Sequence, residues 1–141
     1  MPILNERDRR EVQEQLMILT GSVKLVNFTQ ELACQYCRET EQLLREVKEL
    51  SDKISLEVYN FQLDKEKVAE YRVDKIPATV VEGSKDYGIR FYGIPLGYEF
   101  VPFLEAVKDV SRGSTDLTPE TRAVLAGVRE PVHLQVFTTP T

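Results

Sequence analysis

The motif Cys34-Gln35-Tyr36-Cys37 constrains this chain more than any other feature of its sequence. It follows Val23–Thr29, a short apolar run rich in β-branched and aromatic residues, which is typical of a largely buried strand. It also opens the segment 34–50, in which apolar residues recur at helical spacing. We therefore expect both cysteines on one side of the first turn of a helix that comes directly after a buried strand.

The pattern after the motif predicts a parallel βαβ unit followed by antiparallel strands. A second strand is predicted over 54–63, and we expect the crossover between the two strands to be right-handed. Turn residues over 83–88 then join two short runs, as in a hairpin. Together the segments predict an α/β fold, a central mixed sheet of about four strands flanked by helices: helix 5–19 with Asn5 as cap, strand 23–29, helix 34–50, strand 54–63, helix 65–72 with Asp64 as cap, strands 78–82 and 89–92, and helix 97–112.

Composition excludes several classes of protein. The chain has 141 residues, 42% of them apolar and 29% charged, which suits one globular domain with a short remainder. A net charge of −5 argues against nucleic acid as a partner, because phosphate binding relies on clusters of Lys and Arg. No window approaches the roughly 18 apolar residues of a membrane span, and no basic region precedes an apolar run at the N-terminus. We therefore expect a cytoplasmic protein that contacts neither membrane nor nucleic acid.

The spacing of the two cysteines favours redox chemistry. A structural disulfide gains most when it closes a long loop, and this pair closes almost none. A thiolate is the species that attacks disulfides, and the N-terminus of a helix stabilises it. We predict Cys34 as the outward-facing nucleophile and Cys37 as the resolving residue. Gln35 and Tyr36 are expected to tune the pair and to contact substrate.

Three other uses of the pair remain open at this point. An intramolecular zinc site would need four ligands, and His133 is the only histidine, with no second pair of cysteines. A metal or iron–sulfur site shared between subunits could use Cys34 and Cys37. Two inert buried cysteines at helical spacing are the third alternative. The βαβ context favours redox chemistry over all three, with no metal and no cofactor beyond the cysteines themselves.

Pro77 stands in Ile76-Pro77-Ala78-Thr79, at the start of a predicted strand, where a missing N–H costs least. An ordinary trans proline is one possibility. A cis bond after Ile76 would be a purposeful feature, and the backbone there could then bind an extended substrate strand. Ile76 and Pro77 are therefore candidate substrate-binding residues.

The C-terminal tail repeats the opening of the chain. Thr118 and Pro119 are typical of a helix start. Val132–Thr138 reads as a strand and matches Val23–Thr29 at four of seven positions, at an offset of 109 residues. The alternative is that buried strands resemble one another by composition alone.

The cysteine motif after a buried strand, followed by Tyr71-Arg72-Val73-Asp74-Lys75-Ile76-Pro77, resembles the thioredoxin superfamily. The stretch from Asp86 to Phe100 adds a resemblance to the N-terminal unit of the glutaredoxin-like protein disulfide oxidoreductases, which carry two thioredoxin-fold units, each with its own CxxC. The resemblance implies Cys34 as nucleophile, Cys37 as its partner and Pro77 as a cis proline. It also implies a redox domain over 1–115 and, over 116–141, the start of a second unit that ends before its CxxC.

The chain departs from the family pattern at two places near the motif. Thioredoxins place a buried Asp on the strand before the motif, and the matching residue here is Asn27, which cannot titrate. Glu31 or Glu41 could substitute for it. Ala78 also stands between Pro77 and Thr79, where thioredoxins have Thr directly after the proline. Glutathione binding is not supported, because Tyr98-Glu99 does not supply the residues of a glutaredoxin site.

The sequence thus predicts a protein disulfide oxidoreductase that exchanges disulfides with protein substrates. One alternative is a redox-inactive docking or structural module. The other is an electron relay for a peroxiredoxin or for a flavoprotein like thioredoxin reductase. An unpaired strand at 132–138 is expected to be disordered, to pair with a sheet edge or to mediate a homodimer.

Overall fold

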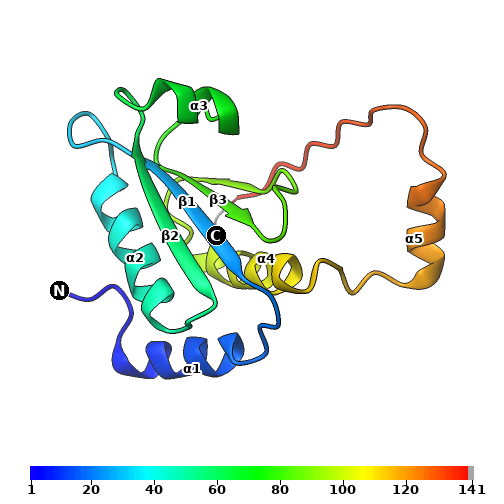
Figure 1. The fold of residues 1–141 in the computed structure, drawn as a ribbon, viewed down its shortest axis with the longest axis horizontal. Coiled ribbons are helices and arrows are strands. Elements are labelled where there is room, and N and C mark those ends of the chain that lie inside the picture. Colours follow the sequence, from blue (N-terminus) through cyan, green and yellow to red (C-terminus); the bar gives the residue numbers. More distant parts are fainter. Residues whose placement is uncertain (140–141) are drawn as a thin grey trace.

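A computed structural model describes residues 1–139 of the chain, and its elements follow the predicted order. Figure 1 shows a sheet with helices on both faces and a separate C-terminal helix. The elements are α1 (Glu6–Leu16), β1 (Val23–Thr29), α2 (Cys37–Glu49), β2 (Ile54–Asn60), α3 (Lys65–Tyr71), β3 (Ala78–Glu82), β4 (Arg90–Tyr92), the 3-10 turn η1 (Gly97–Glu99), α4 (Phe100–Arg112) and α5 (Pro119–Ala126).

The four strands form one mixed sheet in the order β2-β1-β3-β4. β1 pairs in parallel with β2 and antiparallel with β3, and β3 pairs antiparallel with β4. The predicted βαβ unit, hairpin and mixed sheet are therefore confirmed. β1 is a central strand with neighbours on both sides, which explains why five of its seven residues are buried, four of them apolar.

Side chains of β1 alternate between two hydrophobic clusters, one on each face of the sheet. Val23 and Leu25 pack with α1, α2 and α4, whose buried residues include Leu16, Leu44 and Phe103. Val26 and Phe28 pack on the other face, in a smaller cluster with Tyr71 and Val73 at the end of α3. The two faces thus separate a large core under α2 and α4 from a smaller one under α3.

The backbone before α1 is tied to α2 by one buried carboxylate. Glu46 accepts hydrogen bonds from the N–H groups of Ile3 and Leu4, both at 2.8 Å, and from the side-chain amide of Gln42 at 3.0 Å. The guanidinium of Arg9 lies 3.9 Å from the same carboxylate. Both oxygens of the carboxylate therefore accept hydrogen bonds, and the N-terminal segment is held against α2.

The C-terminal end of α4 is fixed where β1 begins. The hydroxyl of Ser111 donates to the carbonyl of Gly21 at 2.8 Å and accepts from the N–H groups of Thr20 and Gly21. A Cβ at Gly21 would lie 2.5 Å from the carbonyl oxygen of Ser111, so only glycine allows this approach. The clamp joins residues 90 positions apart and closes the domain.

The start of α2, the capping of α3 and the C-terminal strand differ from the sequence-based expectations. α2 begins at Cys37, about one turn later than expected, because Tyr36 adopts a left-handed conformation and stops the helix from extending toward Cys34. Asp64 occupies the N-cap position of α3 as expected, but its side chain makes no capping hydrogen bond, because its carboxylate accepts from the N–H of Asn60 at 2.6 Å.

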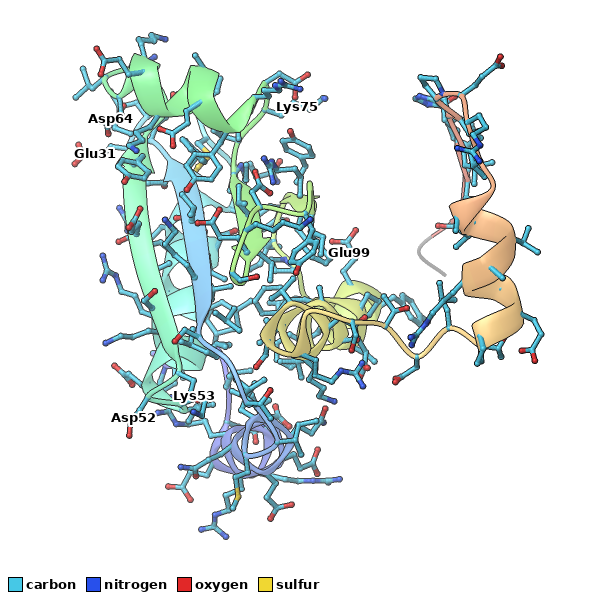
Figure 2. The ribbon with its side chains drawn as sticks, turned by 45° about the vertical axis from the view of Figure 1, so that its right-hand side comes forward. Glu31, Asp52, Lys53, Asp64, Lys75 and Glu99 are labelled. Atoms are coloured by element: carbon cyan, nitrogen blue, oxygen red, sulfur yellow. A yellow bond between two sulfur atoms is a disulfide. The ribbon has the colours of Figure 1, made fainter. Side chains whose placement is uncertain are left out.

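The C-terminal arm contains the expected helix. Thr118 caps α5 by accepting from the N–H of Thr121 at 3.2 Å, with Pro119 at the first position. The segment 132–138 has no strand pairing and is exposed, because no neighbouring strand supplies hydrogen bonds there. Figures 1 and 2 show α5 standing apart from the sheet and its helices. Residues 140 and 141 of the expected second unit lie outside the described residues.

None of the helices in residues 1–139 is long and apolar enough to cross a membrane.

Candidate active site

The two cysteines lie at the carboxyl end of β1 and are joined by a disulfide, with their Cα atoms 5.6 Å apart. Figure 2 shows the disulfide at the end of the sheet near Glu31 and Asp64, opposite the turn with Asp52 and Lys53. The carboxyl ends of β1 and β2 meet at this edge because the two strands run parallel. The motif therefore occupies the part of an α/β sheet where loops gather and binding sites form.

The two cysteines differ in their access to solvent. Cys37 is only 2% exposed, as the first residue of α2, whereas Cys34 is half-buried in the preceding loop. A partner molecule can thus approach Cys34, while Cys37 lies behind it. The helix starts later than expected, but the disulfide bond itself keeps the sulfur of Cys34 beside the first residue of α2.

The loop around the motif holds two residues in left-handed conformations. Ala33 has a φ of 53° and Tyr36 a φ of 67°, a region of backbone conformation that residues other than glycine and asparagine rarely adopt. The carbonyl of Tyr36 accepts from the N–H of Thr40 at 2.9 Å and from its hydroxyl at 2.7 Å. These bonds stabilise the turn. No side chain among the described residues caps α2, so N–H groups of its first turn face the motif.

Positive N–H dipoles at the start of a 13-residue helix stabilise an anion there. The arrangement can therefore support a thiolate on Cys34. Gln35 and Tyr36 are exposed beside it, with 50% of the Tyr36 surface in solvent.

Pro77 follows a cis peptide bond from Ile76, as the family resemblance implied. Phe28, near the end of β1, is paired with Ala78, so Pro77 lies at the same edge of the sheet as the cysteines. The carbonyl of Pro77 accepts from the N–H of Gly93 at 2.8 Å. The backbone of the half-buried Ile76 makes no hydrogen bond within residues 1–139 and is left available to a ligand.

A shallow polar groove of about 340 Å³ runs beside the disulfide. Glu31, Arg38 and Glu39 are exposed on its walls. Glu41 also lines it, and its carboxylate pairs with Arg45 at 2.6 Å. Neither Glu31 nor Glu41 is buried, so neither reproduces a buried acid behind the cysteines.

Asn27 is fully buried, as its place on a central strand requires. Its side-chain N–H donates to the carbonyl of Ala78 at 3.0 Å. The residue opposite it on β3 is Thr79, also fully buried, which we did not single out beyond its offset from Pro77. The available signal was a polar residue inside the buried part of each strand, Asn27 in β1 and Thr79 in β3.

Within residues 1–139, no three His, Cys, Asp or Glu side chains gather as they would around a metal ion. The largest shift in pKa lies away from the motif, at Lys24 near the start of β1. The hydrogen bond with Glu82 raises the pKa of Lys24 above its usual range, against the opposing effect of burial. This cross-strand pair, 2.8 Å long, belongs to the structure of the sheet and not to the site.

Comparison with known proteins identifies the domain. The sequence profile of the "Thioredoxin domain" family matches residues 22–104, which contain the motif, the cis proline and all four strands. The "Probable Thioredoxin" of Methanothermobacter thermautotrophicus is 34% identical over 77 residues, covering 54% of this chain and 82% of that protein.

Two solved structures extend the similarity beyond this domain. A protein disulfide oxidoreductase from Aeropyrum pernix superposes with a TM-score of 0.79 and 25% identity, covering 89% of this chain. The N-terminal domain of the alkylhydroperoxide reductase AhpF from Enterococcus faecalis gives 0.76 and 27%, covering 87%. This chain spans 56% and 60% of the lengths of those two structures. The fold, the CxxC disulfide and these matches place the chain in the thioredoxin superfamily, as a thioredoxin-like disulfide oxidoreductase.

Proposed function

We propose that residues 1–115 exchange disulfides with protein substrates, with Cys34 as the nucleophile and Cys37 as the resolving cysteine. The difference in burial between the two cysteines carries this proposal, because Cys34 is the more accessible of the two to a large partner. In the reducing direction, the thiolate of Cys34 attacks a substrate disulfide and releases one substrate thiolate. Cys37 then attacks the mixed disulfide, which forms the Cys34–Cys37 bond and releases the second substrate thiolate.

Substrate binding relies on the exposed groups around the thiols. The free backbone of Ile76 pairs with an extended substrate segment beside Pro77, as one strand pairs with another. Gln35 and Tyr36 contact the same segment from the motif side. No metal and no cofactor takes part, because the two cysteines carry both electrons.

Reduction of a protein disulfide tests the proposal. The reduced chain should reduce insulin in the presence of a dithiol donor, and Cys34→Ser should abolish this activity. Cys37→Ser should instead accumulate a mixed disulfide through Cys34. Equal alkylation of both cysteines, with ordinary titration near about pH 8.5 and no insulin reduction, would support a redox-inactive docking module.

An electron relay is the second candidate, and the similarity to the N-terminal domain of AhpF favours it. In that role the chain passes electrons between a flavoprotein reductase and a peroxiredoxin. The partner trapped on the Cys37→Ser variant distinguishes the two candidates. A single dominant redox enzyme indicates a relay, whereas many unrelated proteins indicate a general oxidoreductase.

We further propose that residues 116–141 begin a second thioredoxin-like unit. The capped helix α5 supports this, since it repeats the opening of the chain and exposes the apolar residues Val124 and Leu125. A CxxC encoded soon after codon 141 would support the second unit. A homodimer through 132–138 is the alternative use of the arm, and a mass that doubles with concentration would favour it. A cytoplasmic location completes the proposal.

A further inference from the structure

Two buried polar atoms in residues 1–139 make no hydrogen bond with the protein. They are the side-chain oxygen of Asn27 and the hydroxyl of Thr79, and both residues are 0% exposed. Folded proteins pair nearly all such atoms, because a buried oxygen that has lost water and gained no partner is costly. Each of these two atoms can therefore form a further hydrogen bond.

The two residues are direct neighbours in the sheet. Asn27 on β1 is the register partner of Thr79 on β3, which places their side chains on the same face and their Cβ atoms about 5 Å apart. The amide of Asn27 donates its N–H to the carbonyl of Ala78 at 3.0 Å, so its orientation is fixed. The unpaired oxygen of Asn27 and the unpaired hydroxyl of Thr79 thus form one small polar site.

This site lies on the face of the sheet that α2 covers. Side chains alternate along a strand, so Asn27 lies on the same face as Val23 and Leu25, which pack under α2 and α4. Val26 lies on the opposite face, under α3. Thr79 is likewise in step with Val81, a member of the larger core. The apolar core of this face therefore gives way to polar groups toward the carboxyl end of β1.

Cys37 begins α2 at this same end, with 2% of its surface exposed. Thr40 follows one turn later and is also fully buried, but its hydroxyl is already bonded to the carbonyl of Tyr36 at 2.7 Å. Among the buried polar side chains described in residues 1–139, those of Asn27 and Thr79 contain the two atoms without a hydrogen-bond partner.

We propose that Asn27 and Thr79 hold one water molecule beneath Cys37, and that this water donates a hydrogen bond to the Cys37 thiolate when it resolves the mixed disulfide. The water accepts from the hydroxyl of Thr79 and donates to the oxygen of Asn27, and its second proton points to the sulfur. The inference rests on the proposed function, because it assigns Asn27 and Thr79 as positioning residues for the resolving step.

The chemistry of that step explains the need for such a donor. Cys37 attacks the sulfur of Cys34, the bond between Cys34 and the partner breaks, and its electron pair leaves on the partner sulfur. The attacking species is a thiolate, which a buried and apolar site disfavours. Asn27 and Thr79 are uncharged, so they stabilise this anion without an ionisation of their own.

Stopped-flow reaction of the reduced full chain with 5,5′-dithiobis(2-nitrobenzoate) tests the inference. Attack by Cys34 releases a first coloured thiolate, and attack by Cys37 on the resulting mixed disulfide releases a second. In Thr79→Val the second phase should slow about tenfold near neutral pH, and its pH midpoint should rise by about one unit. The first phase should be unchanged, and Thr79→Ser should restore the second.

The two phases separate the possible failures. A wild-type chain with no first phase at Cys34 would contradict the proposed function itself. A Thr79→Val chain whose second phase keeps the wild-type rate and pH midpoint overturns the water site alone. If Thr79→Val folds poorly, the variant Asn27→Asp tests the water site in its place. Its added carboxylate should introduce a further transition into the pH profile of the second phase, and a profile that overlays the wild type overturns the inference.

Discussion

The buried polar groups at the two ends of α2 differ in whether they have hydrogen-bond partners. Toward its C-terminal end, the carboxylate of Glu46 accepts hydrogen bonds from two backbone N–H groups and an amide, and a guanidinium lies beside it. At its N-terminal end, the oxygens of Asn27 and Thr79 face the helix without a partner from the described chain. Satisfied groups hold a fold together, whereas spare capacity next to a reactive atom is typical of a functional site.

Removing the satisfied carboxylate should give the largest loss of stability. Glu46→Ala leaves the N–H groups of the half-buried Ile3 and the buried Leu4 without an acceptor, and we expect a loss of about 3 kcal/mol in the free energy of unfolding. Urea unfolding followed by circular dichroism measures it. Glu49→Ala is the matched control, since Glu49 pairs with Arg9 at the surface, and we expect a change of less than about 0.5 kcal/mol. Equal losses in both variants would contradict the comparison.

The stabilising effect of Glu46 should also depend on pH. Burial alone raises the pKa of Glu46, but hydrogen bonds from Leu4, Ile3 and Gln42 and the charge of Arg9 outweigh it, so the pKa is lowered. A carboxyl with a lowered pKa stabilises the fold above its unfolded value of about 4.3. This contribution is lost as the pH falls through the folded value.

Glu46→Gln cannot titrate at this position and serves as the reference. The difference in unfolding free energy between wild type and Glu46→Gln should be constant near neutral pH and should shrink below about pH 4.3. Urea titrations at a series of pH values measure it. A difference that grows as the pH falls would show that folding raises the pKa of Glu46 and does not lower it.

The unsatisfied end should respond more weakly in stability. Thr79→Val removes a buried hydroxyl and keeps its shape, so we expect the free energy of unfolding to change by less than about 1 kcal/mol. The same urea titration measures it. A loss as large as that of Glu46→Ala would mean that Thr79 is structural and would remove the contrast between the two ends.

The C-terminal arm should contribute least of all. Neither α5 nor residues 127–139 bury a side chain, so a chain that ends after Ser114 should unfold at the same urea concentration as the full chain. The insulin-reduction rate should also stay the same. A clear drop in either would show that the arm docks on the domain or on a second copy.

Local patterns in the sequence were enough to predict most of the sheet. Alternation and apolar runs placed β1, β3 and β4, and short-range caps at Asn5 and Thr118 were read correctly because their partners lie three residues away. The family resemblance supplied the cis bond at Pro77.

Long-range contacts account for what the sequence did not predict. The bonds of Glu46 to Ile3 and Leu4 and the clamp of Ser111 on Gly21 join residues 42 to 91 positions apart. Nothing local distinguishes these side chains from exposed ones on a helix. The late start of α2 likewise depends on the left-handed Tyr36, a conformation that its side chain does not favour.

The hydrogen bonds between Ser111 and Gly21 fix the position at which the chain leaves the domain toward any further domain. Gly21 precedes β1, so the chain leaves the domain at the pole of the sheet opposite the disulfide. The seven residues of β1 separate the two poles by roughly 20 Å. A further domain joined after Gly113 is thus attached at the end of the sheet opposite the disulfide, and the disulfide end stays accessible to other proteins. Disulfide exchange between two such units requires their cysteines to meet, so either the linker lets the second unit reach around the domain or a third protein exchanges disulfides with each unit in turn.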